Sequence, residues 1–423
     1  MRRYWICAWK IALQWWSKQG GFISMSGKQQ LAVGLDVGSS RTRCVICALE
    51  GDQLRCVSYG LAVSGGWTKG RITDQDAVAE SIRAAVADAE RGAKISVESA
   101  TLGMGGRAIH GAQGRGLYEF GRPREIDADD LAYAVELGSD VALERDRMVL
   151  HVAPQDFILD GRAGFRKPTR GVCSRLEANV HLVTASVQEH QALIASAHLA
   201  HLPVEETVFE PMAAAYACVG PEERARGVAI VDIGLESSGL VLYDGERLIL
   251  ASSLPVTADH FTRDIAWMLK VSYEDAESLK RQYGCAMLGL TSESTLIEIP
   301  SPEGRPPREG HRSELIDVLE ARADQLFGFV RGEIQRAGMD RSLLEGVLLT
   351  GGGAMLPGMW DMAEKKLDTT ACLGLARGIG DWPEELHSPV WATAAGLAMY
   401  SAKLKLHRPP PRRSRGLMGL VMR

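Results

Sequence analysis

Leu31-Ala-Val-Gly-Leu-Asp36-Val-Gly38-Ser39-Ser40 begins a pattern that returns in the second half of the chain as Gly227-Val-Ala-Ile-Val-Asp232-Ile-Gly234-Leu-Glu-Ser237-Ser238. Each unit is an apolar strand, then Asp-x-Gly, then small hydroxyl residues and a second apolar strand. The tight turn of such a hairpin offers backbone N–H groups and hydroxyls to an anion. The pattern therefore predicts a duplicated domain that closes on one phosphate chain from both sides, with Asp36 and Asp232 holding a magnesium ion through water.

A single Asp-x-Gly turn is weak evidence, because such turns also join ordinary hairpins. The flanking strands and the second copy favour a phosphate loop. The second copy is altered, since Leu235 and Glu236 stand where a phosphate loop would prefer glycine. Glu236 would repel a terminal phosphate if it pointed inward, whereas binding would survive if it pointed outward.

A third motif is Leu348-Leu-Thr-Gly351-Gly352-Gly353-Ala-Met. Consecutive glycines after a buried strand let the backbone approach a flat or charged ligand closely. The alternative is a simple strand-to-helix turn, but three glycines are more than that geometry needs. We therefore expect a ligand contact here.

Two further places carry charged candidates. Glu210 begins an expected helix and could orient a water against a terminal phosphate, or could simply favour the positive end of the helix dipole. Glu277 and Lys280 share one face of a helix expected over 274–282. They could hold ribose and base, or form an exposed ion pair worth only tenths of a kcal/mol.

Composition bounds the class of protein. The 423 residues are 46% hydrophobic and suggest about two to four domains, with no apolar run of the roughly 18 residues that span a bilayer. Eight cysteines are scattered without a framework, which fits a reducing cytoplasm. Cys44-x-x-Cys47 lies in an expected strand, so we interpret both as core residues rather than a metal pair.

The charge is distributed unevenly along the chain. Residues 1–24 and 401–423 carry Lys and Arg but no acid, so the body between them is strongly acidic. This pattern does not suggest binding to nucleic acid. It suggests a terminus that meets an anionic surface.

The C-terminal tail has two parts. Arg408-Pro-Pro-Pro-Arg-Arg-Ser-Arg415 is expected to be a stiff basic linker. Residues 416–423 form a short apolar segment that suits a membrane surface in a helical conformation, although a disordered terminus is the alternative. Its membrane-facing residues would be Leu417, Met418, Leu420, Val421 and Met422.

Periodicity and capping predict the main elements. Helices are expected over 76–92, with Asp74 as N-cap, from Asp127 to about 144, over 188–201 and over 313–337. Strands are expected at 95–104, 149–152 and 156–159, and Val180–Thr184 is expected to resume the main sheet.

The ordered motifs resemble those of the actin-like ATPase superfamily. Within it, His151-Val-Ala-Pro-Gln-Asp-Phe, Ala178-Asn-Val-His-Leu-Val-Thr, Gln282-Tyr-Gly-Cys-Ala and Gly304-Arg-Pro-Pro-Arg308 are similar to strings of the FtsA family of bacterial division proteins. The resemblance covers about 26–423. It implies an α/β fold of duplicated actin-like (ribonuclease H-like) domains around a nucleotide cleft, with an FtsA-type subdomain inserted in the first half.

The resemblance also implies a division of the chain into parts. The N-terminal extension is 1–25, either disordered or a start-site artefact, although a membrane-surface segment is the alternative. The expected subdomains are 1A (26–95 plus 179–203), the insertion 1C (96–178), 2A (204–256 plus 316–400) and 2B (257–315), followed by the basic linker (401–415) and a short amphipathic helix (416–423).

Function and partners follow from the same resemblance. Members bind ATP and Mg²⁺, polymerise at the cytoplasmic face of the membrane at the division site, tether the C-terminal tail of FtsZ and recruit later division proteins. The FtsZ tail docks on the region corresponding to 257–315, where Arg305 and Arg308 could meet an acidic peptide. The altered loop at Leu235 and Glu236 leads us to expect nucleotide binding with slow or absent hydrolysis.

Two other functions compete with this one. A sugar or acetate kinase has the same fold, but no second acidic motif for a catalytic base stands out, and a kinase has no use for the tail. The pilus-assembly protein PilM shares the inserted subdomain. The Gly304-Arg-Pro-Pro-Arg turn and the tail favour the FtsA family over PilM.

Overall fold

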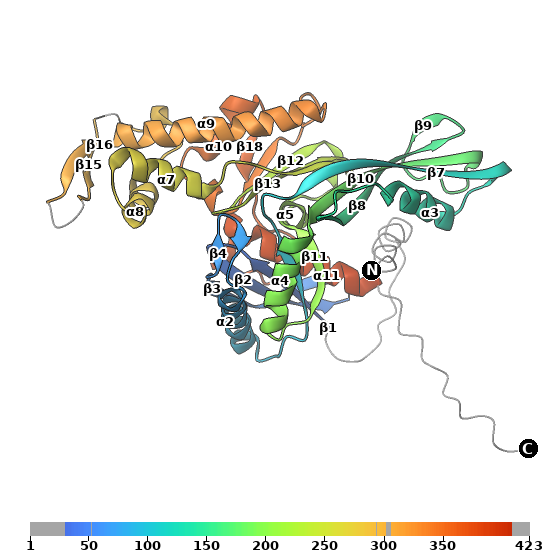
Figure 1. Cartoon of the computed structure of the whole chain (residues 1–423), viewed down its shortest axis with the longest axis horizontal. Helices are drawn as coiled ribbons and strands as arrows, with labels where there is room; N and C mark the ends of the chain where they lie inside the picture. The colour runs from blue at the N-terminus through green and yellow to red at the C-terminus, as the bar shows by residue number, and fades with distance from the viewer. Residues whose placement is uncertain (1–29, 52, 293, 302–305, 408–423) are drawn as a thin grey trace, which may run out of the picture.

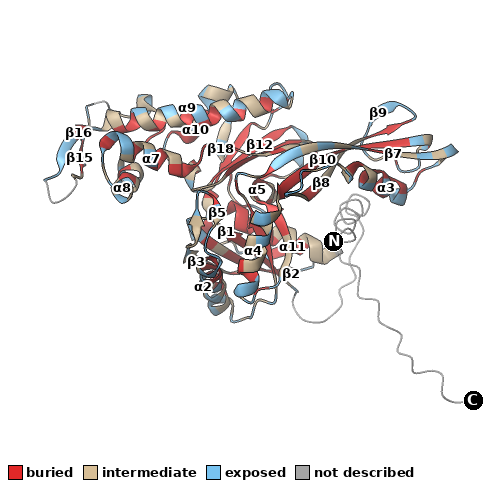
Figure 2. Cartoon of the chain, viewed as in Figure 1, coloured by how far each residue is buried: buried red, intermediate tan, exposed pale blue. Residues whose placement is uncertain are grey.

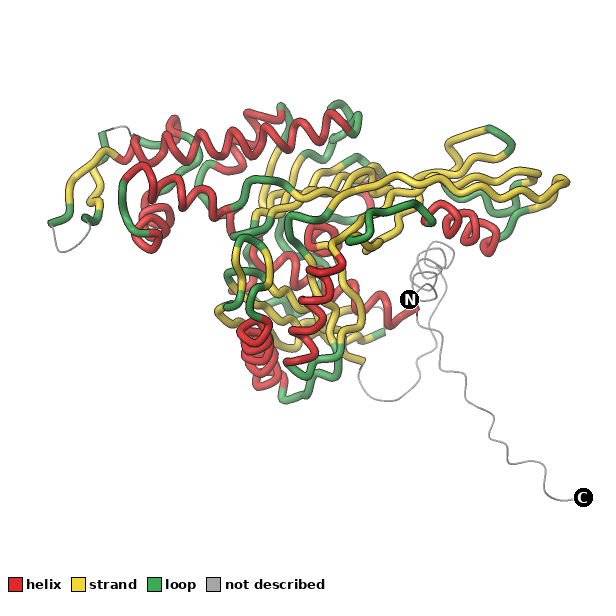
Figure 3. Tube along the Cα trace, viewed as in Figure 1, coloured by secondary structure: helices red, strands yellow, loops and turns green. Residues whose placement is uncertain are grey.

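The computed structural model describes residues 30–51, 53–292, 294–301 and 306–407. Figure 1 shows two halves, with an inserted sheet extending to one side and the β15–β16 hairpin at the opposite end. Figure 3 shows the same arrangement by secondary structure, with long strands on the side of the insertion and long helices on the other. Among the described residues, no helix has both the length and the apolar character needed to cross a membrane.

The first half is built on a five-stranded sheet in the order β11-β6-β1-β2-β3. Its strands are β1 (Gln30–Val37), β2 (Arg41–Glu50), β3 (Gln53–Val63), β6 (Ala100–Met104) and β11 (Val204–Phe209). β1 to β3 run antiparallel, whereas β6 is parallel to both β1 and β11. Cys44 and Cys47 are buried in β2, as expected of core residues.

The second half repeats this plan. Its sheet has the order β14-β13-β12-β17-β18, with β12 (Val228–Ile233), β13 (Ser238–Asp244), β14 (Arg247–Ser253), β17 (Val347–Thr350) and β18 (Ala371–Leu373). Three strands are again antiparallel, and two parallel strands follow on the other side of β12. The predicted duplication is therefore confirmed by the strand topology.

Helices cover the first sheet. α2 (Gln75–Ala93) packs on β3 and α4 (Val187–Leu199) on α2. The carboxylate of Asp74 accepts hydrogen bonds from the backbone N–H groups of Asp76 and Ala77, so the predicted N-cap is present. The short hairpin of β4 (Trp67–Thr68) and β5 (Arg71–Ile72) precedes α2.

The last helix crosses back to the first half. α11 (Ala392–His407) packs on β1 and on α5 (Glu210–Cys218). A Cβ at Gly34 of β1 would lie 2.3 Å from the carbonyl oxygen of Ala394, so only glycine fits this crossing. We expected both 204–209 and 392–400 in subdomain 2A, but β11 pairs with β6 of the first sheet. Contacts between segments that are far apart in the sequence therefore place both β11 and α11 with the first half.

A four-stranded sheet, β7-β10-β8-β9, forms the insertion. It contains β7 (His110–Glu125), β8 (Arg147–Leu159), β9 (Arg162–Phe165) and β10 (Val172–Ser186), with α3 (Ala128–Ser139) on one face. Its core is a separate cluster that includes Leu131, Phe157 and Leu176.

Four expectations about the insertion were wrong. Residues 180–184 belong to β10 and pair with β7 and β8, so they do not resume the main sheet. β6, expected inside the insertion, belongs to the first sheet. The strands expected at 149–152 and 156–159 are one strand, β8, because an irregularity near Pro154 interrupts its alternation without ending it. α3 also ends at Ser139 rather than near 144.

Outside its five-stranded sheet, the second half consists mainly of helices. These are α6 (Pro221–Ala225), α7 (Ala258–Leu269), α8 (Tyr273–Tyr283), α9 (Arg312–Arg336) and α10 (Met359–Leu367), with the hairpin β15 (Leu296–Ile299) and β16 (Arg308–His311). Short 3₁₀ turns lie at 288–290, 352–355, 384–386 and 389–391. The helices expected at 274–282 and 313–337 are therefore confirmed. Figure 2 shows the buried residues concentrated in the two main sheets and on the inner faces of the helices.

Candidate functional site

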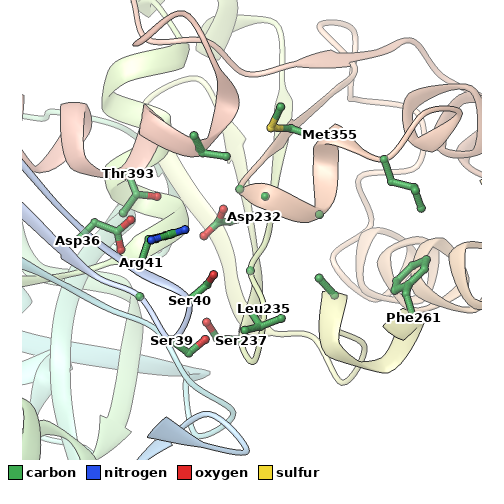
Figure 4. A pocket seen from close by; sticks show the side chains of 18 of the residues that line it. Asp36, Ser39, Ser40, Arg41, Asp232, Leu235, Ser237, Phe261, Met355 and Thr393 are labelled. Carbon is green, nitrogen blue, oxygen red and sulfur yellow. The ribbon is translucent and has the colours of Figure 1, made fainter. Parts of the chain in front are cut away.

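A cavity of about 470 Å³ lies between the two halves and contains most of the predicted site. Figure 4 shows side chains from both halves turned toward it, among them Asp36, Ser39, Ser40, Asp232 and Ser237. The predicted residues that line the cavity are Asp36, Gly38, Ser39, Ser40, Glu210, Asp232, Gly234, Ser237, Glu277, Lys280, Gly351, Gly352 and Gly353. Residues from five segments far apart in the sequence thus meet at one site.

Asp36 lies one residue before the end of β1, beside a cation. Arg43 Nη1 lies 3.5 Å from Asp36 Oδ2, and the guanidinium also lies 5.7 Å from the centroid of the Trp391 ring. Burial raises the pKa of Asp36, and the charge of Arg43 opposes that rise. The carboxylate is therefore fixed at the cavity wall but only partly neutralised.

Asp232 occupies the corresponding position at the end of β12. The Thr350 hydroxyl donates a hydrogen bond to Asp232 Oδ1 at 3.0 Å. Burial, and then the charge of Asp36, raise the pKa of Asp232 to about 6, while the Thr350 hydrogen bond opposes the rise. The two predicted aspartates therefore face one cavity from the two halves.

Glu210 adds a third acid as the first residue of α5. Burial raises its pKa well above the usual range, and the charges of Asp36 and Asp232 raise it further. A cation among these carboxylates would relieve their repulsion. Within the described parts of the chain, no three His, Cys, Asp or Glu side chains are arranged to hold a metal directly. Carboxylate oxygens suit Mg²⁺, which keeps several waters, so these residues fit a water-bridged magnesium ion.

Glu277 and Lys280 form a compact, half-buried network on α8. Lys280 Nζ lies 2.6 Å from Glu277 Oε2 and donates to the Thr262 hydroxyl at 2.6 Å. That hydroxyl in turn donates to Glu277 Oε2 at 2.7 Å. Both side chains line the cavity, so the interpretation as a freely exposed surface pair is excluded.

The second hairpin turn is closed by a hydrogen bond from Gly234 N to the carbonyl oxygen of Ser237 at 2.8 Å. Leu235 and Ser237 line the cavity, but Glu236 between them does not. Its carboxylate turns away and accepts a hydrogen bond from the backbone N–H of Gly70 at 2.9 Å. The charge that would repel a phosphate is therefore directed out of the cavity.

Ser238 does not belong to the site. It was predicted with Ser237, but successive residues of a strand point to opposite faces, and Ser238 is buried at the start of β13 without lining the cavity. Its hydroxyl has no hydrogen-bond partner within the described residues.

Two arginines and an apolar wall also line the cavity, although they were not among the predicted site residues. Arg41 and Arg43 line the cavity from β2. They are two residues apart on a strand and therefore share a face, a pattern in the sequence that could have indicated their place beside the first turn. Phe261, Met355 and Leu356 form the apolar side. Met355 and Leu356 closely follow the triple-glycine turn, whereas Phe261 lies on α7, and no local pattern connects α7 with that turn.

The predicted partner and membrane residues lie elsewhere. Arg308 is exposed in β16, and its guanidinium donates to the carbonyl oxygen of Leu269 at 3.3 Å. Arg305 lies outside the described residues. So do the N-terminal extension 1–25, the tail residues Leu417, Met418, Leu420, Val421 and Met422, and residues 408–415 of the expected linker. Residues 401–407, which were also expected in the linker, belong instead to α11.

Comparison with solved structures places the fold. The structure of a PilM–PilN type IV pilus biogenesis complex matches with a TM-score of 0.64 at 18% identity, covering 89% of this chain and 99% of that chain. The ADP-bound MreB5 of Spiroplasma citri matches with a TM-score of 0.53 at 12% identity, covering 90% and 99%. With the duplicated sheets around one cavity, these similarities define an actin-like fold.

Sequence comparison identifies the family. The model described as cell division protein FtsA matches residues 229–396, and the model of the SHS2 domain inserted in FtsA matches 106–184. The cell division protein FtsA of Pseudomonas aeruginosa is 31% identical over 376 residues, which are 89% of each chain. The chain belongs to the FtsA family and is an actin-like cell division protein.

Proposed function

We propose that the protein binds ATP with Mg²⁺ in the cavity between its halves, polymerises on the cytoplasmic face of the membrane, tethers FtsZ and recruits later division proteins. The observation that carries this proposal is the convergence of two Asp-x-Gly hairpins and a triple-glycine turn on one cavity of about 470 Å³. That volume lies in the range of small-molecule and cofactor sites.

The two sides of the cavity suit the two ends of a nucleotide. The phosphates would lie between the turns that carry Ser39, Ser40 and Ser237, where backbone N–H groups, hydroxyls and Arg41 offer donors to anionic oxygens. The adenosine would lie against Gly351–Gly353 and the apolar wall of Phe261 and Met355, within reach of Glu277 and Lys280.

The three carboxylates would then have separate roles. Asp36 and Asp232 would hold the waters of a magnesium ion, whose charge would shield the terminal phosphates. Glu210 would orient the attacking water. Because Leu235 lines the cavity where a phosphate loop would prefer glycine, we expect slow hydrolysis, and the nucleotide would serve mainly to control assembly.

Calorimetric titration with ATP, ADP and AMP tests nucleotide binding. We expect ATP and ADP to bind with Mg²⁺ and AMP to bind at least about tenfold more weakly, because it lacks the phosphates that reach both turns. Phosphate release measured on the same protein gives the turnover. Absence of ATP binding would contradict the proposal, and rapid hydrolysis would contradict the proposed control of assembly.

Support for an FtsZ site comes from the β15–β16 hairpin. Arg308 is an exposed cation there, and Trp267, 84% exposed on α7, offers apolar area in the same part of the second half. An acidic peptide with apolar residues fits such a surface. Charge reversal by Arg308→Glu should weaken binding of a peptide from the FtsZ C-terminus, whereas Arg162→Glu on β9 of the insertion should not.

The membrane role is supported by the composition of 408–423, which carries a basic run followed by apolar residues. Each cation near anionic lipid contributes about 1 kcal/mol. Deletion of 414–423 should abolish sedimentation with vesicles containing phosphatidylglycerol. Retention of binding by the truncated protein would place the lipid contact elsewhere, with residues 1–24 as the next segment to delete.

A further inference from the structure

The two halves are joined at the mouth of the cavity by a contact that uses the altered residue of the second hairpin. Glu236 Oε2 accepts a hydrogen bond from the backbone N–H of Gly70 at 2.9 Å. Gly70 lies in the β4–β5 turn of the first half, and Glu236 in the β12–β13 turn of the second half. The contact therefore crosses from one half to the other.

The approach of the two turns is close. A Cβ at Gly70 would lie 2.7 Å from the carbonyl oxygen of Glu236, and Gly70 has a φ of +76°. Both facts demand glycine at this position. The backbone N–H of Glu236 also donates to the Ser39 hydroxyl of the first hairpin at 3.3 Å. Glu236 thus contacts two turns of the opposite half, one through its side chain and one through its backbone.

Each side of this contact is anchored in its own half. On the first side, Arg71 pairs with Glu189 of α4 at 3.2 Å, and the backbone N–H groups of Thr73 and Asp74 donate to the carbonyl oxygen of Gly66. On the second side, the N–H of Asp259 at the start of α7 donates to the carbonyl oxygen of Leu235 at 2.8 Å. Opening the cavity therefore requires breaking the Glu236 contacts rather than bending either turn.

We propose that Glu236 is a positioning residue that holds the two phosphate turns together before any nucleotide is bound. With glycine at this place, the backbone contact to Ser39 would remain, but no side chain would reach the Gly70 amide. Here a carboxylate of the protein makes the bridge. The turns of Ser39 and Ser237 then face each other in advance, so that less binding free energy goes into closing the cavity.

The nucleotide part of this inference rests on the proposed function, whereas the contact itself does not. Amide hydrogen exchange of the nucleotide-free protein therefore measures the contact separately. In Glu236→Ala we expect the Gly70 amide to exchange at least about tenfold faster than in the unaltered protein, because it loses its acceptor. Glu236→Gln retains an acceptor oxygen and should preserve protection, as should Lys69→Ala, a matched change of an exposed side chain in the same turn.

ATP affinity separates this role from charge repulsion. We expect Glu236→Ala to bind ATP about tenfold more weakly and Glu236→Gln to bind it within about twofold of the unaltered protein. Tighter ATP binding by both variants would show that the carboxylate repels phosphate, and would overturn the proposal. Unchanged exchange of the Gly70 amide in Glu236→Ala would overturn it as well.

Gly70→Ala approaches the contact from the other side. Its Cβ would collide with the Glu236 carbonyl oxygen and force the turns apart, so it should reproduce the weaker ATP binding of Glu236→Ala with Glu236 still present. ATP binding unaffected by Gly70→Ala would contradict the proposal. If the unaltered protein binds no nucleotide, the proposed function fails, and the exchange measurement alone still decides whether the contact exists.

Discussion

Asp232 and Thr350 stand directly opposite each other in the parallel pair of β12 and β17, and the Thr350 hydroxyl donates to the Asp232 carboxylate at 3.0 Å. Both residues are buried. This single hydrogen bond orients the carboxylate but does not offset its desolvation, so the pKa of Asp232 is raised to about 6. A charged Asp232 is therefore poorly stabilised by the protein's own groups at neutral pH.

The first prediction concerns stability against pH. The pKa of Asp232 is about 6 in the folded protein, compared with 3.8 for an aspartate exposed in the unfolded chain. Between pH 3.8 and pH 6, the folded state therefore binds a proton more readily than the unfolded state. The charged form is a destabilising contribution above pH 6, and the contribution disappears as the pH falls toward 4. Asp232→Asn should therefore be more stable than the unaltered protein at pH 7, by about 2–3 kcal/mol, with the difference vanishing near pH 4.

Urea unfolding of the nucleotide-free protein at several pH values measures this difference. Asp317→Asn, an exposed change on α9, is the control and should alter stability little at any pH. A lower stability of Asp232→Asn at pH 7 would contradict the assignment of Asp232 as a buried, poorly compensated carboxylate.

Glu210→Gln should separate binding from hydrolysis. The substitution preserves shape and removes the group proposed to orient water, so we expect phosphate release to fall at least about 100-fold. ATP affinity should change by no more than about threefold. Glu206→Gln, a half-buried change in β11 away from the cavity, should leave both quantities unaltered. Equal hydrolysis by Glu210→Gln and the unaltered protein, in single-turnover assays, would remove Glu210 from the reaction.

Arg41→Ala should weaken the binding of phosphates but not of adenosine. Arg41 lines the cavity on an exposed part of β2, and a charge-assisted hydrogen bond to a phosphate is stronger than a neutral one. We expect an affinity for ATP about tenfold lower and an unchanged affinity for adenosine, measured by calorimetry. Arg91→Ala on α2 serves as the control. A parallel loss for both ligands would indicate a general distortion of the cavity.

The crossing of β1 and α11 predicts a large difference between two glycine substitutions. Gly34→Ala would place a Cβ 2.3 Å from the Ala394 carbonyl oxygen, so we expect a loss of about 3 kcal/mol or more. Gly332→Ala in α9 meets no atom within 4 Å and should stabilise the protein by about 0.5–1 kcal/mol. Thermal unfolding of both variants checks the pair, and similar melting temperatures would contradict the close packing.

Local patterns predicted the parts of the site that local chemistry determines. The Asp36 and Asp232 turns, the triple-glycine turn and the N-cap at Asp74 each depend on neighbouring residues, and the structure has the turns at the cavity and the cap on α2. The fold class followed from the repeat of these units.

Long-range pairing decided what the sequence could not predict. β11 and α11 join the first half because of contacts with β6 and β1, which no local pattern encodes. The direction of the Glu236 side chain depends on Gly70, a residue far away in the sequence. Ser238 belongs to β13 rather than to the turn, and the sequence motif does not mark where the turn ends and the strand begins.

The place where α11 ends has a mechanical consequence. The described chain ends at His407 on a helix that is packed against β1, so the basic tail is rooted in the first half. In the proposed membrane-bound protein, the tail would hold the first half at the membrane, and the second half would move relative to the first. Release of the Glu236 contact would therefore move Arg308 and the proposed FtsZ contact relative to the lipid. The inserted sheet would remain as a second connection between the halves, because the Ala251 N–H of β14 donates to His181 of β10 at 3.2 Å.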